Sequence, residues 1–325
     1  MTADAAFGYA PGKVILLGEH AVVYGQPALA GTLDRGVRVA ISRAGNADGP
    51  WLRGSGFGID VVGVRPDPGG AGPESLRRAL GTLVQLYGER VRELSIVVDG
   101  GIPAGSGLGS SAALSVAMIR GVHQFFGEEL DVETVIRDAF TLEGVFHGTP
   151  SGVDHSVIAR GGLLRFEKSS SGEVTLTELP LRRRLRLVVG LAGAHAGTAY
   201  AVAALRERSK RHPKAYERLF HSIGELVSEA QRCLADGHLA ALGELMDLNQ
   251  GYLNALGVST PAIEALCAIA RDRGALGAKL TGAGGGGAMI ALVDEDADPV
   301  VKAFQAAGYN AFETELRASA ISHES

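Results

Sequence analysis

The feature that most constrains this chain is a glycine-rich segment between an apolar, strand-like run and a predicted helix. The segment reads PAGSGLGSSAA over residues 103–113. Its three alternating glycines let the backbone turn sharply and present several N–H groups inward. Two serines then begin the helix, whose N-terminus attracts negative charge. This combination predicts a loop that binds a polyphosphate, whereas the glycines alone would equally fit a tight strand-to-helix turn.

The composition is that of a folded protein with an excess of glycine. The chain has 325 residues, which suggests one large domain or two ordinary ones, and 46% of them are hydrophobic, enough for a sizeable core. Its 46 glycines gather in local clusters, which indicates phosphate-binding or tight-turn loops rather than disorder. The net charge of −5 argues against nucleic acid or an anionic membrane as the main partner.

Targeting and redox patterns predict a cytoplasmic protein. The first residues, MTADAAFGYAPGK, lack the positive region and apolar stretch of a secretory signal. No apolar run reaches the ~18 residues that a membrane helix needs. Cys233 and Cys267 lie within helix-like apolar patterns, so we expect both to be free, buried thiols.

Helical and strand-like patterns mix along the chain without strict βαβ alternation, which favours an α+β fold over a doubly wound parallel sheet. The composition changes near residue 180 from strand-rich to mostly helical, which predicts one α+β domain over residues 1–180 and a second over residues 181–325. The predicted strands are 14–17, 37–41, 94–98, 161–166, 185–191 and 288–293. The predicted helices are 74–88, 110–126, 131–146, 198–212, 213–236, 238–255 and one that begins at Pro261, before a final helix and strand.

Two standard nucleotide-binding motifs fail in this sequence. The one Gly-Lys pair, at residues 12–13, is followed by Val14 rather than by Ser or Thr, so it is not a P-loop. Gly282, Gly284 and Gly287 fit the dinucleotide-binding pattern, but they lead into a strand rather than a helix. These glycines would let another backbone or a ligand approach closely, or would form a bulge or a hairpin corner.

Charged side chains occupy two further places suited to catalysis. Lys13 begins an apolar strand that ends at Glu19 and His20, although spacing alone more often means a solvated lysine and a structural histidine. Glu143 lies near a helix end, and Asp154 follows a Gly/Pro-rich turn. Phosphoryl transfer needs an oxygen ligand for Mg²⁺ and a carboxylate facing the attacking hydroxyl, and such a turn could place both. The sequence is equally consistent with Glu143 as an ordinary charge at a helix end and Asp154 as an ordinary turn residue. The histidines lack the spacing of a zinc site.

Taken together and in this order, the segments resemble the superfamily of galactokinase, homoserine kinase, mevalonate kinase and phosphomevalonate kinase. Within it the chain most resembles the mevalonate kinases, from about residue 8 to residue 293. GEHAVVYG together with HGTPSGVD is the most specific part of the resemblance. The matching segments are YAPGKVILLGEHAVVYGQP (9–27), PAGSGLGSSAAL (103–114), HGTPSGVD (147–154), NALGVSTPAIEAL (254–266) and LTGAGGGG (280–287).

The resemblance implies a two-domain α+β kinase with its active site in the cleft between an N-terminal, ATP-binding domain and a C-terminal domain. It implies that Asp154 faces the substrate hydroxyl and that Lys13 stabilises charge beside it. Ser111 and Glu143 match the Mg²⁺ ligands. The substrate side would comprise Lys13, Glu19, His20, Asp154 and Thr198. The ATP phosphates would be bound by Pro103, Ala104, Gly105, Ser106, Gly107, Leu108, Gly109, Ser110, Ser111 and Ala112.

The implied reaction is transfer of the ATP γ-phosphate to the 5-hydroxyl of mevalonate, with Mg²⁺ as cofactor and no nucleic acid or membrane partner; a homodimer is left open. Phosphomevalonate or homoserine is the alternative substrate, and a non-catalytic nucleotide-binding protein is a further alternative. Ala21-Val-Val argues against a sugar kinase, and the set of Lys13, Glu143 and Asp154 argues against a related decarboxylase.

One segment departs from the superfamily pattern. Related enzymes often carry a Ser/Thr-Lys pair in the turn after the strand at 185–191. Here Thr198 keeps the hydroxyl, but the lysine position is apolar. We therefore expect His20 or backbone N–H groups to hold the substrate carboxylate, and a high KM for mevalonate is left open.

Overall fold

The structure is a computed structural model that describes residues 5–44, 49–55, 59–63, 74–147, 152–169, 173–193 and 197–316. The chain divides into two compact units, each assembled from several segments. Unit 1 comprises Met1–Gly12, Arg35–Ala104 and Gly109–Arg160, and unit 2 comprises Lys13–Asp34, Gly105–Leu108 and Gly161–Ser325. Strands β1 (Ala5–Leu17) and β2 (Ala28–Arg43) each contribute to both units. The division into domains at residue 180 stays a prediction.

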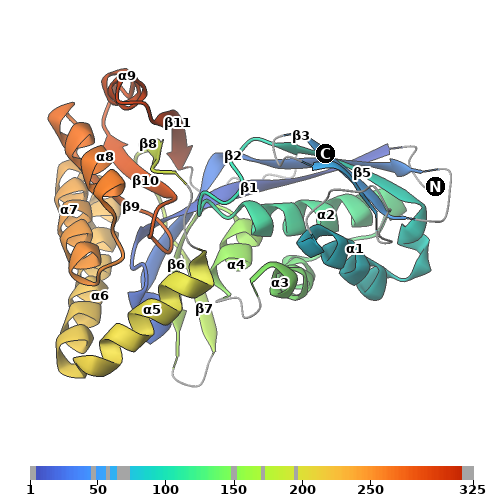
Figure 1. The fold of residues 1–325 in the computed structure, drawn as a ribbon, viewed down its shortest axis with the longest axis horizontal. Coiled ribbons are helices and arrows are strands. Elements are labelled where there is room, and N and C mark those ends of the chain that lie inside the picture. The colour runs from blue at the N-terminus through green and yellow to red at the C-terminus, as the bar shows by residue number, and fades with distance from the viewer. Residues whose placement is uncertain are drawn as a thin grey trace. The chain divides into compact units, whose positions relative to one another are not determined.

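Unit 1 is a sheet with helices against it (Figure 1). The sheet contains β4 (Ile59–Gly63), β3 (Trp51–Ser55), β5 (Leu94–Gly100) and the second half of β2, in that order. β3 and β5 are parallel, whereas the other described pairs in this part of the sheet are antiparallel. The helices are α1 (Glu74–Tyr87), α2 (Ser110–Phe126), α3 (Val132–His147) and α4 (Val153–Arg160), with a short 3-10 helix at Glu89–Glu93.

Helix α2 is the central helix of unit 1, because it packs at backbone distance against the strands. A Cβ on Gly8 of β1 would lie 2.0 Å from the carbonyl oxygen of Ala117. A Cβ on Gly121 of α2 would lie 2.8 Å from Cδ1 of Ile41 on β2. Small residues therefore let the helix lie close to the sheet, which fixes the position of its first turn at Ser110 and Ser111.

Unit 2 is built on a second group of strands, with β2 followed by β11 (Asn310–Leu316), β8 (Leu185–Leu191), β10 (Ala288–Val293) and β9 (Gly277–Leu280). The pairs are antiparallel, with Ile290 opposite Val189 and Phe312 opposite the same residue on its other side. Strand β6 (Leu163–Lys168) pairs with β2, and β7 (Val174–Glu178) pairs with β6.

The helices of unit 2 are α5 (Thr198–Arg211), α6 (Pro213–Asp236), α7 (Leu239–Ala255), α8 (Pro261–Asp272) and α9 (Asp298–Ala306). Helices α6, α7 and α8 lie next to the strands β8 to β10 (Figure 1). Helix α7 approaches β9 closely, since a Cβ on Gly277 would lie 2.0 Å from the carbonyl oxygen of Gly243. Asp247 of α7 also accepts the backbone N–H of Ala278 at 2.8 Å. All four residues of β9 are buried.

The predicted α+β class is confirmed, and so are the bounds of the helices 110–126 and 213–236 and of the strands 185–191 and 288–293. The first two strands are much longer than predicted, since 14–17 and 37–41 are only the most apolar parts of β1 and β2. The rest of β1 alternates exposed and buried residues and is rich in Ala and Gly, which are depleted in strands and hide its pattern.

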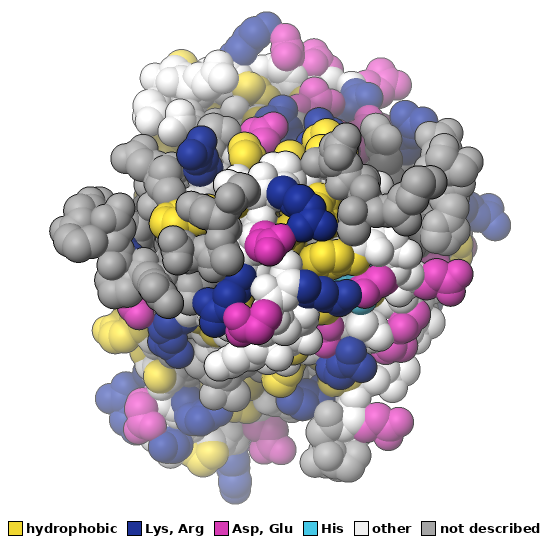
Figure 2. Space-filling model, turned by 90° about the vertical axis from the view of Figure 1, so that its right-hand side faces the viewer, with side chains coloured by type: hydrophobic (Ala, Val, Ile, Leu, Met, Phe, Trp, Pro, Cys, Tyr) yellow, Lys and Arg dark blue, Asp and Glu magenta, His cyan; other side chains and the backbone are white. Residues whose placement is uncertain are grey.

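The two cysteines differ. Both are free, and Cys267 is buried as predicted, but Cys233 is half-buried because it lies at the edge of the buried face of α6. Along the described part of the chain, no helix is both long enough and apolar enough to cross a membrane. On the face drawn in Figure 2, the described Lys and Arg side chains are interspersed with Asp and Glu.

Candidate functional site

The N-terminal signature forms the end of β1 and a tight turn after it. Gly18 has φ +103°, and a Cβ on it would lie 2.5 Å from the Cα of Ala28, so only glycine fits there. His20 follows with φ +59°, a left-handed conformation that is uncommon for a residue other than glycine. The short 3-10 helix Ala21–Tyr24, called η1 here, comes next. The turn is therefore tightly constrained, and it presents Glu19 and His20 to the interior of unit 2.

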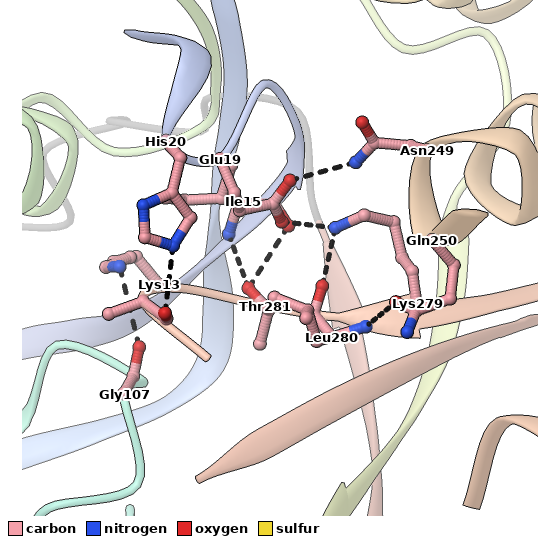
Figure 3. A network of polar contacts seen from close by, with 11 residues as sticks. Lys13, Ile15, Glu19, His20, Gly107, Asn249, Gln250, Lys279, Leu280 and Thr281 are labelled. Atoms are coloured by element: carbon pink, nitrogen blue, oxygen red, sulfur yellow. Dashed lines mark hydrogen bonds and ion pairs between the residues drawn. The ribbon is translucent and has the colours of Figure 1, made fainter. Parts of the chain in front are cut away.

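Lys13 of β1 lies against the phosphate loop. Its backbone N–H donates to the carbonyl oxygen of Leu108 at 2.9 Å. Its Nζ donates to the carbonyl oxygen of Gly107 at 3.5 Å (Figure 3). The side chain is only 2% exposed, so this lysine is not the solvated flank that spacing alone would favour. The structure thus places a cationic side chain at the middle of the predicted phosphate loop.

The phosphate loop has the backbone conformation that its glycines predict. Gly105, Gly107 and Gly109 have φ of +68°, +82° and +75°, all in the left-handed region. Helix α2 begins at Ser110, directly after Gly109, whose lack of a side chain leaves no cap over the first turn. The first N–H groups of a helix that lack such a cap can bind an anion.

The second glycine loop, between β9 and β10, contacts the first. Gly282 and each of Gly284 to Gly287 have positive φ. A Cβ on Gly282 would lie 3.3 Å from the carbonyl oxygen of Gly107, so the two loops meet backbone to backbone. Nε2 of His20 lies 2.9 Å from the carbonyl oxygen of Ala283 in the same loop. The two glycine loops, which are far apart in the sequence, therefore contact each other and the N-terminal signature within unit 2.

The contact with Ala283 defines the hydrogen-bonding role of His20. Burial lowers the pKa of His20 below its ordinary value of 6.5; the hydrogen bond to Ala283 opposes this, and the positive charge of Arg208 adds to it. The ring is therefore neutral at pH 7. Because a carbonyl oxygen only accepts hydrogen bonds, the hydrogen is on Nε2, and Nδ1 is left as an acceptor.

Glu19 lies in a fully buried polar network. Its Oε1 accepts from the ammonium group of Lys279, and its Oε2 accepts from Nδ2 of Asn249 at 3.0 Å (Figure 3). Burial raises the pKa of Glu19 and lowers that of Lys279, while the attraction between the two charges opposes both shifts. Both carboxylate oxygens of Glu19, a predicted substrate contact, therefore accept hydrogen bonds from other residues of the protein.

Unit 1 carries the other predicted site residues on three helices that pack against one another. Ser111 lies in the first turn of α2 and is half-buried, and Asp154 lies in the first turn of α4 and is also half-buried. Glu143 of α3 is buried, and its Oε2 lies 2.6 Å from Nδ1 of His155. His155 was not predicted as a site residue. Its only sequence signal is that it directly follows Asp154.

Some predicted features lie outside the described residues. They include residues 148–151 of the turn before Asp154, residues 194–196, and the side chains of His147 and Thr198. Among the residues that the structure describes, no three His, Cys, Asp or Glu side chains gather as metal ligands.

Comparison with known proteins decides the family. Residues 74–162 match the family model of the GHMP kinases N terminal domain, and residues 230–310 match that of the GHMP kinases C terminal. The mevalonate kinase of Thermococcus sibiricus is 37% identical over 317 residues, which cover 92% of each chain. The chain belongs to the mevalonate kinase family. Another relative of the same family, from Methanothermobacter thermautotrophicus, is 36% identical over 90% of this chain and 92% of its own.

Solved structures of mevalonate kinases have the same fold. The structure described as L. major mevalonate kinase in complex with R-mevalonate has a TM-score of 0.84 at 30% identity, with 98% of this chain and 97% of that chain covered. The Methanococcus jannaschii mevalonate kinase has a TM-score of 0.81 at 25% identity, with 98% and 99% covered. The predicted superfamily, fold and enzyme class are thus confirmed, and the chain is a kinase that uses ATP as co-substrate.

Proposed function

We propose that this chain transfers the γ-phosphate of ATP to the 5-hydroxyl of mevalonate, with Mg²⁺ as cofactor, in the cytoplasm. The observation that carries the proposal is the position of Lys13. Its N–H and its ammonium group both contact the middle of the predicted phosphate loop, at Leu108 and Gly107. A fixed positive charge at this loop would stabilise the negative charge of a transferred phosphoryl group.

Asp154 is the residue we assign to the attacking hydroxyl. It lies in the first turn of α4, where the helix N-terminus favours a negative charge. It is half-buried, so a ligand can reach it. In this role the carboxylate orients the hydroxyl and accepts its proton as the oxygen–phosphorus bond forms.

Ser111 and Glu143 are the residues we assign to Mg²⁺. A hydroxyl and a carboxylate are the oxygen donors that Mg²⁺ prefers, and this ion usually takes only one or two protein ligands beside phosphates and water. The hydrogen bond from His155 occupies Oε2 of Glu143 and leaves Oε1 for a metal. When bound, Mg²⁺ would neutralise charge on the ATP phosphates.

His20 is the residue we assign to a substrate hydroxyl other than the one that is phosphorylated. A neutral ring that already donates from Nε2 to Ala283 has no second N–H to offer a carboxylate. We therefore replace the expectation that His20 holds the mevalonate carboxylate with one in which its Nδ1 accepts from a hydroxyl. Backbone N–H groups remain the expected partners of the carboxylate.

A coupled ADP-release assay tests the proposed reaction. It compares mevalonate, phosphomevalonate, homoserine and galactose at saturating Mg-ATP, and it includes an assay without acceptor as the control for ATP hydrolysis. We expect the highest kcat/KM for mevalonate, and a product that carries a phosphomonoester on the 5-oxygen by ³¹P NMR. Turnover of mevalonate no faster than that of homoserine or phosphomevalonate would overturn the proposed substrate and leave the kinase activity standing.

Light scattering would measure whether the chain forms the homodimer that the sequence analysis left open.

A further inference from the structure

Lys279 lies at the centre of a buried polar network that no step of the proposed reaction uses. Its side chain is 0% exposed, on the four-residue strand β9. Its Nζ donates to Oε1 of Glu19 and, at 2.6 Å, to the carbonyl oxygen of Leu280 (Figure 3). Asn249 of α7 donates to the other oxygen of Glu19. The network therefore links α7, β9 and the turn after β1 within unit 2.

Stability alone is a weak reason for a lysine and a glutamate to be fully buried together. Both charges lose their hydration, and replacing such a pair with apolar residues of similar volume is often neutral or stabilising. Removing one partner, by contrast, leaves an uncompensated buried charge. This asymmetry favours a role for the pair in fixing the arrangement of two segments over a role in overall stability.

The two segments held by Lys279 are those that orient His20. Through Glu19, the ammonium group fixes the constrained turn between Gly18 and η1, in which His20 has φ +59°. Through its bond to Leu280, it fixes the end of β9, which leads into the glycine loop. That loop contains Ala283, whose carbonyl oxygen accepts from Nε2 of His20. Both ends of the His20–Ala283 hydrogen bond are therefore anchored to one buried cation.

The side chains of Thr281 and Gln250 also form hydrogen bonds at the end of β9. Oγ1 of Thr281 accepts the backbone N–H of Ile15 at 2.9 Å and donates to its carbonyl oxygen at 3.1 Å. Gln250 of α7 accepts the N–H of Leu280 at 2.8 Å. The end of β9 is thus held by these neutral side chains as well as by Lys279, whereas Lys279 holds the turn that carries His20 by its charge, through Glu19.

We propose that Lys279 is a positioning residue for the acceptor alcohol: through Glu19 it holds His20 against the glycine loop, so that Nδ1 of His20 meets a hydroxyl of the substrate. The inference rests on the proposed function, because it assigns a residue to recognition of the same substrate. Lys279 would contact neither substrate nor nucleotide.

The first test is the effect of Lys279→Met on the two substrates. Methionine keeps most of the length of the side chain and removes the charge. We expect the KM for mevalonate to rise about 10- to 100-fold, the scale on which lost outer-shell hydrogen bonds weaken a site, and the KM for ATP to change less than about twofold. Lys302→Met is the matched control, because Lys302 is exposed and paired with Asp298 on α9. An equal rise of both KM values would overturn the inference.

The second test separates positioning from stability. The double variant Glu19→Gln/Lys279→Met removes both charges of this buried pair, so we expect it to recover most of the thermal stability that either single change loses. If Lys279 positions His20, the double variant keeps the raised mevalonate KM. If the KM returns to the wild-type value together with the melting temperature, the pair serves only the fold. If Lys279→Met alone does not fold, the mevalonate KM and ATP KM are compared in the double variant instead.

The third test is coupling with His20. Because Lys279 would act through His20, the variant His20→Ala/Lys279→Met should have the same mevalonate KM as His20→Ala alone. If the mevalonate KM of the double variant is instead raised by the product of the two single-variant effects, the inference is overturned. The wild-type assay with mevalonate comes first, so that failure of the proposed function is seen separately. If another alcohol is the better acceptor, the same KM comparison is made with that alcohol.

Discussion

Nδ1 of His155 lies 2.6 Å from Oε2 of Glu143, and both side chains are buried. The ring of Phe140, one helical turn before Glu143, lies edge-on against the histidine with centroids 5.4 Å apart. His155 directly follows Asp154 on α4, whereas Glu143 is on α3. The residue beside the proposed catalytic carboxylate therefore orients the proposed metal ligand, and displacement of α4 would disturb both.

The variant Glu143→Gln tests the metal assignment. Glutamine can still accept a hydrogen bond from His155, but it lacks the charge that attracts Mg²⁺. We expect the Mg²⁺ concentration for half-maximal rate to rise roughly 10-fold or more. Glu133→Gln on the same helix is the control, because Glu133 is exposed and paired with Arg160. A Mg²⁺ titration at fixed ATP with an unchanged midpoint and intact activity would count against the assignment.

Replacement of His155 tests whether its hydrogen bond orients Glu143. Asparagine can place an N–H near the position of Nδ1, whereas leucine cannot donate at all. We expect His155→Leu to raise the Mg²⁺ requirement about 10-fold and His155→Asn to raise it much less. Binding of Mn²⁺ to the ADP complex, followed by electron paramagnetic resonance, gives a readout independent of turnover. Equal midpoints for the two variants would contradict the orienting role.

The variant Asp154→Asn tests the catalytic carboxylate. It keeps the size of the side chain and removes the proton acceptor, so we expect kcat to fall about 10²- to 10⁴-fold. Asp154 is half-buried in a first helical turn, where asparagine is tolerated, so the melting temperature should change little. Steady-state kinetics and a thermal melt together check this result, and near-normal turnover would refute the role.

The variant Gly107→Val tests the phosphate loop. Gly107 has φ +82°, and a Cβ there would lie 3.8 Å from the carbonyl oxygen of Thr281, so the site has room but the conformation is strained. Gly127→Val at the C-terminal end of α2 is the matched control, with φ +67° and open space around it. We expect both variants to lose about 1–2 kcal/mol of stability and only Gly107→Val to lose ATP affinity. Calorimetry that finds ATP binding intact in Gly107→Val would make the loop a simple turn.

The lowered pKa of His20 predicts a specific pH dependence of stability. Below pH 6.5, the ordinary pKa of histidine, His20 becomes protonated in the unfolded chain but stays neutral in the folded protein until the pH reaches its lower folded-state pKa. The free energy of unfolding therefore falls as the pH drops from 6.5 toward the lower pKa of the folded state. Urea denaturation of the wild type and His20→Asn at about pH 7.5 and about pH 5.5 measures this loss, which we expect to be larger in the wild type than in the variant. Parallel losses would show that the His20 pKa is not lowered.

Local sequence was sufficient for several of the helices and strands and for the backbone conformation of the first glycine loop. The alternating glycines before Ser110 already require a backbone with positive φ, and the apolar run from Leu185 to Leu191 already requires a buried strand. Both depend only on residues close together in the chain. The order of the four glycine and charge motifs was likewise enough to predict the superfamily, which the relatives confirm.

Tertiary structure alone decided how the charged residues are paired. The sequence analysis assigned no role to Lys279, and the resemblance made Glu19 a substrate contact. They form an ion pair only because α7 and β9 bring together residues 260 positions apart and exclude water from both. The bond between Glu143 and His155 arises in the same way, from the packing of α3 against α4. The sequence by itself determined where the chain turns and which side chains could do chemistry. Burial depends on distant segments, so only the tertiary structure determined which of the charged side chains pair with other residues of the chain.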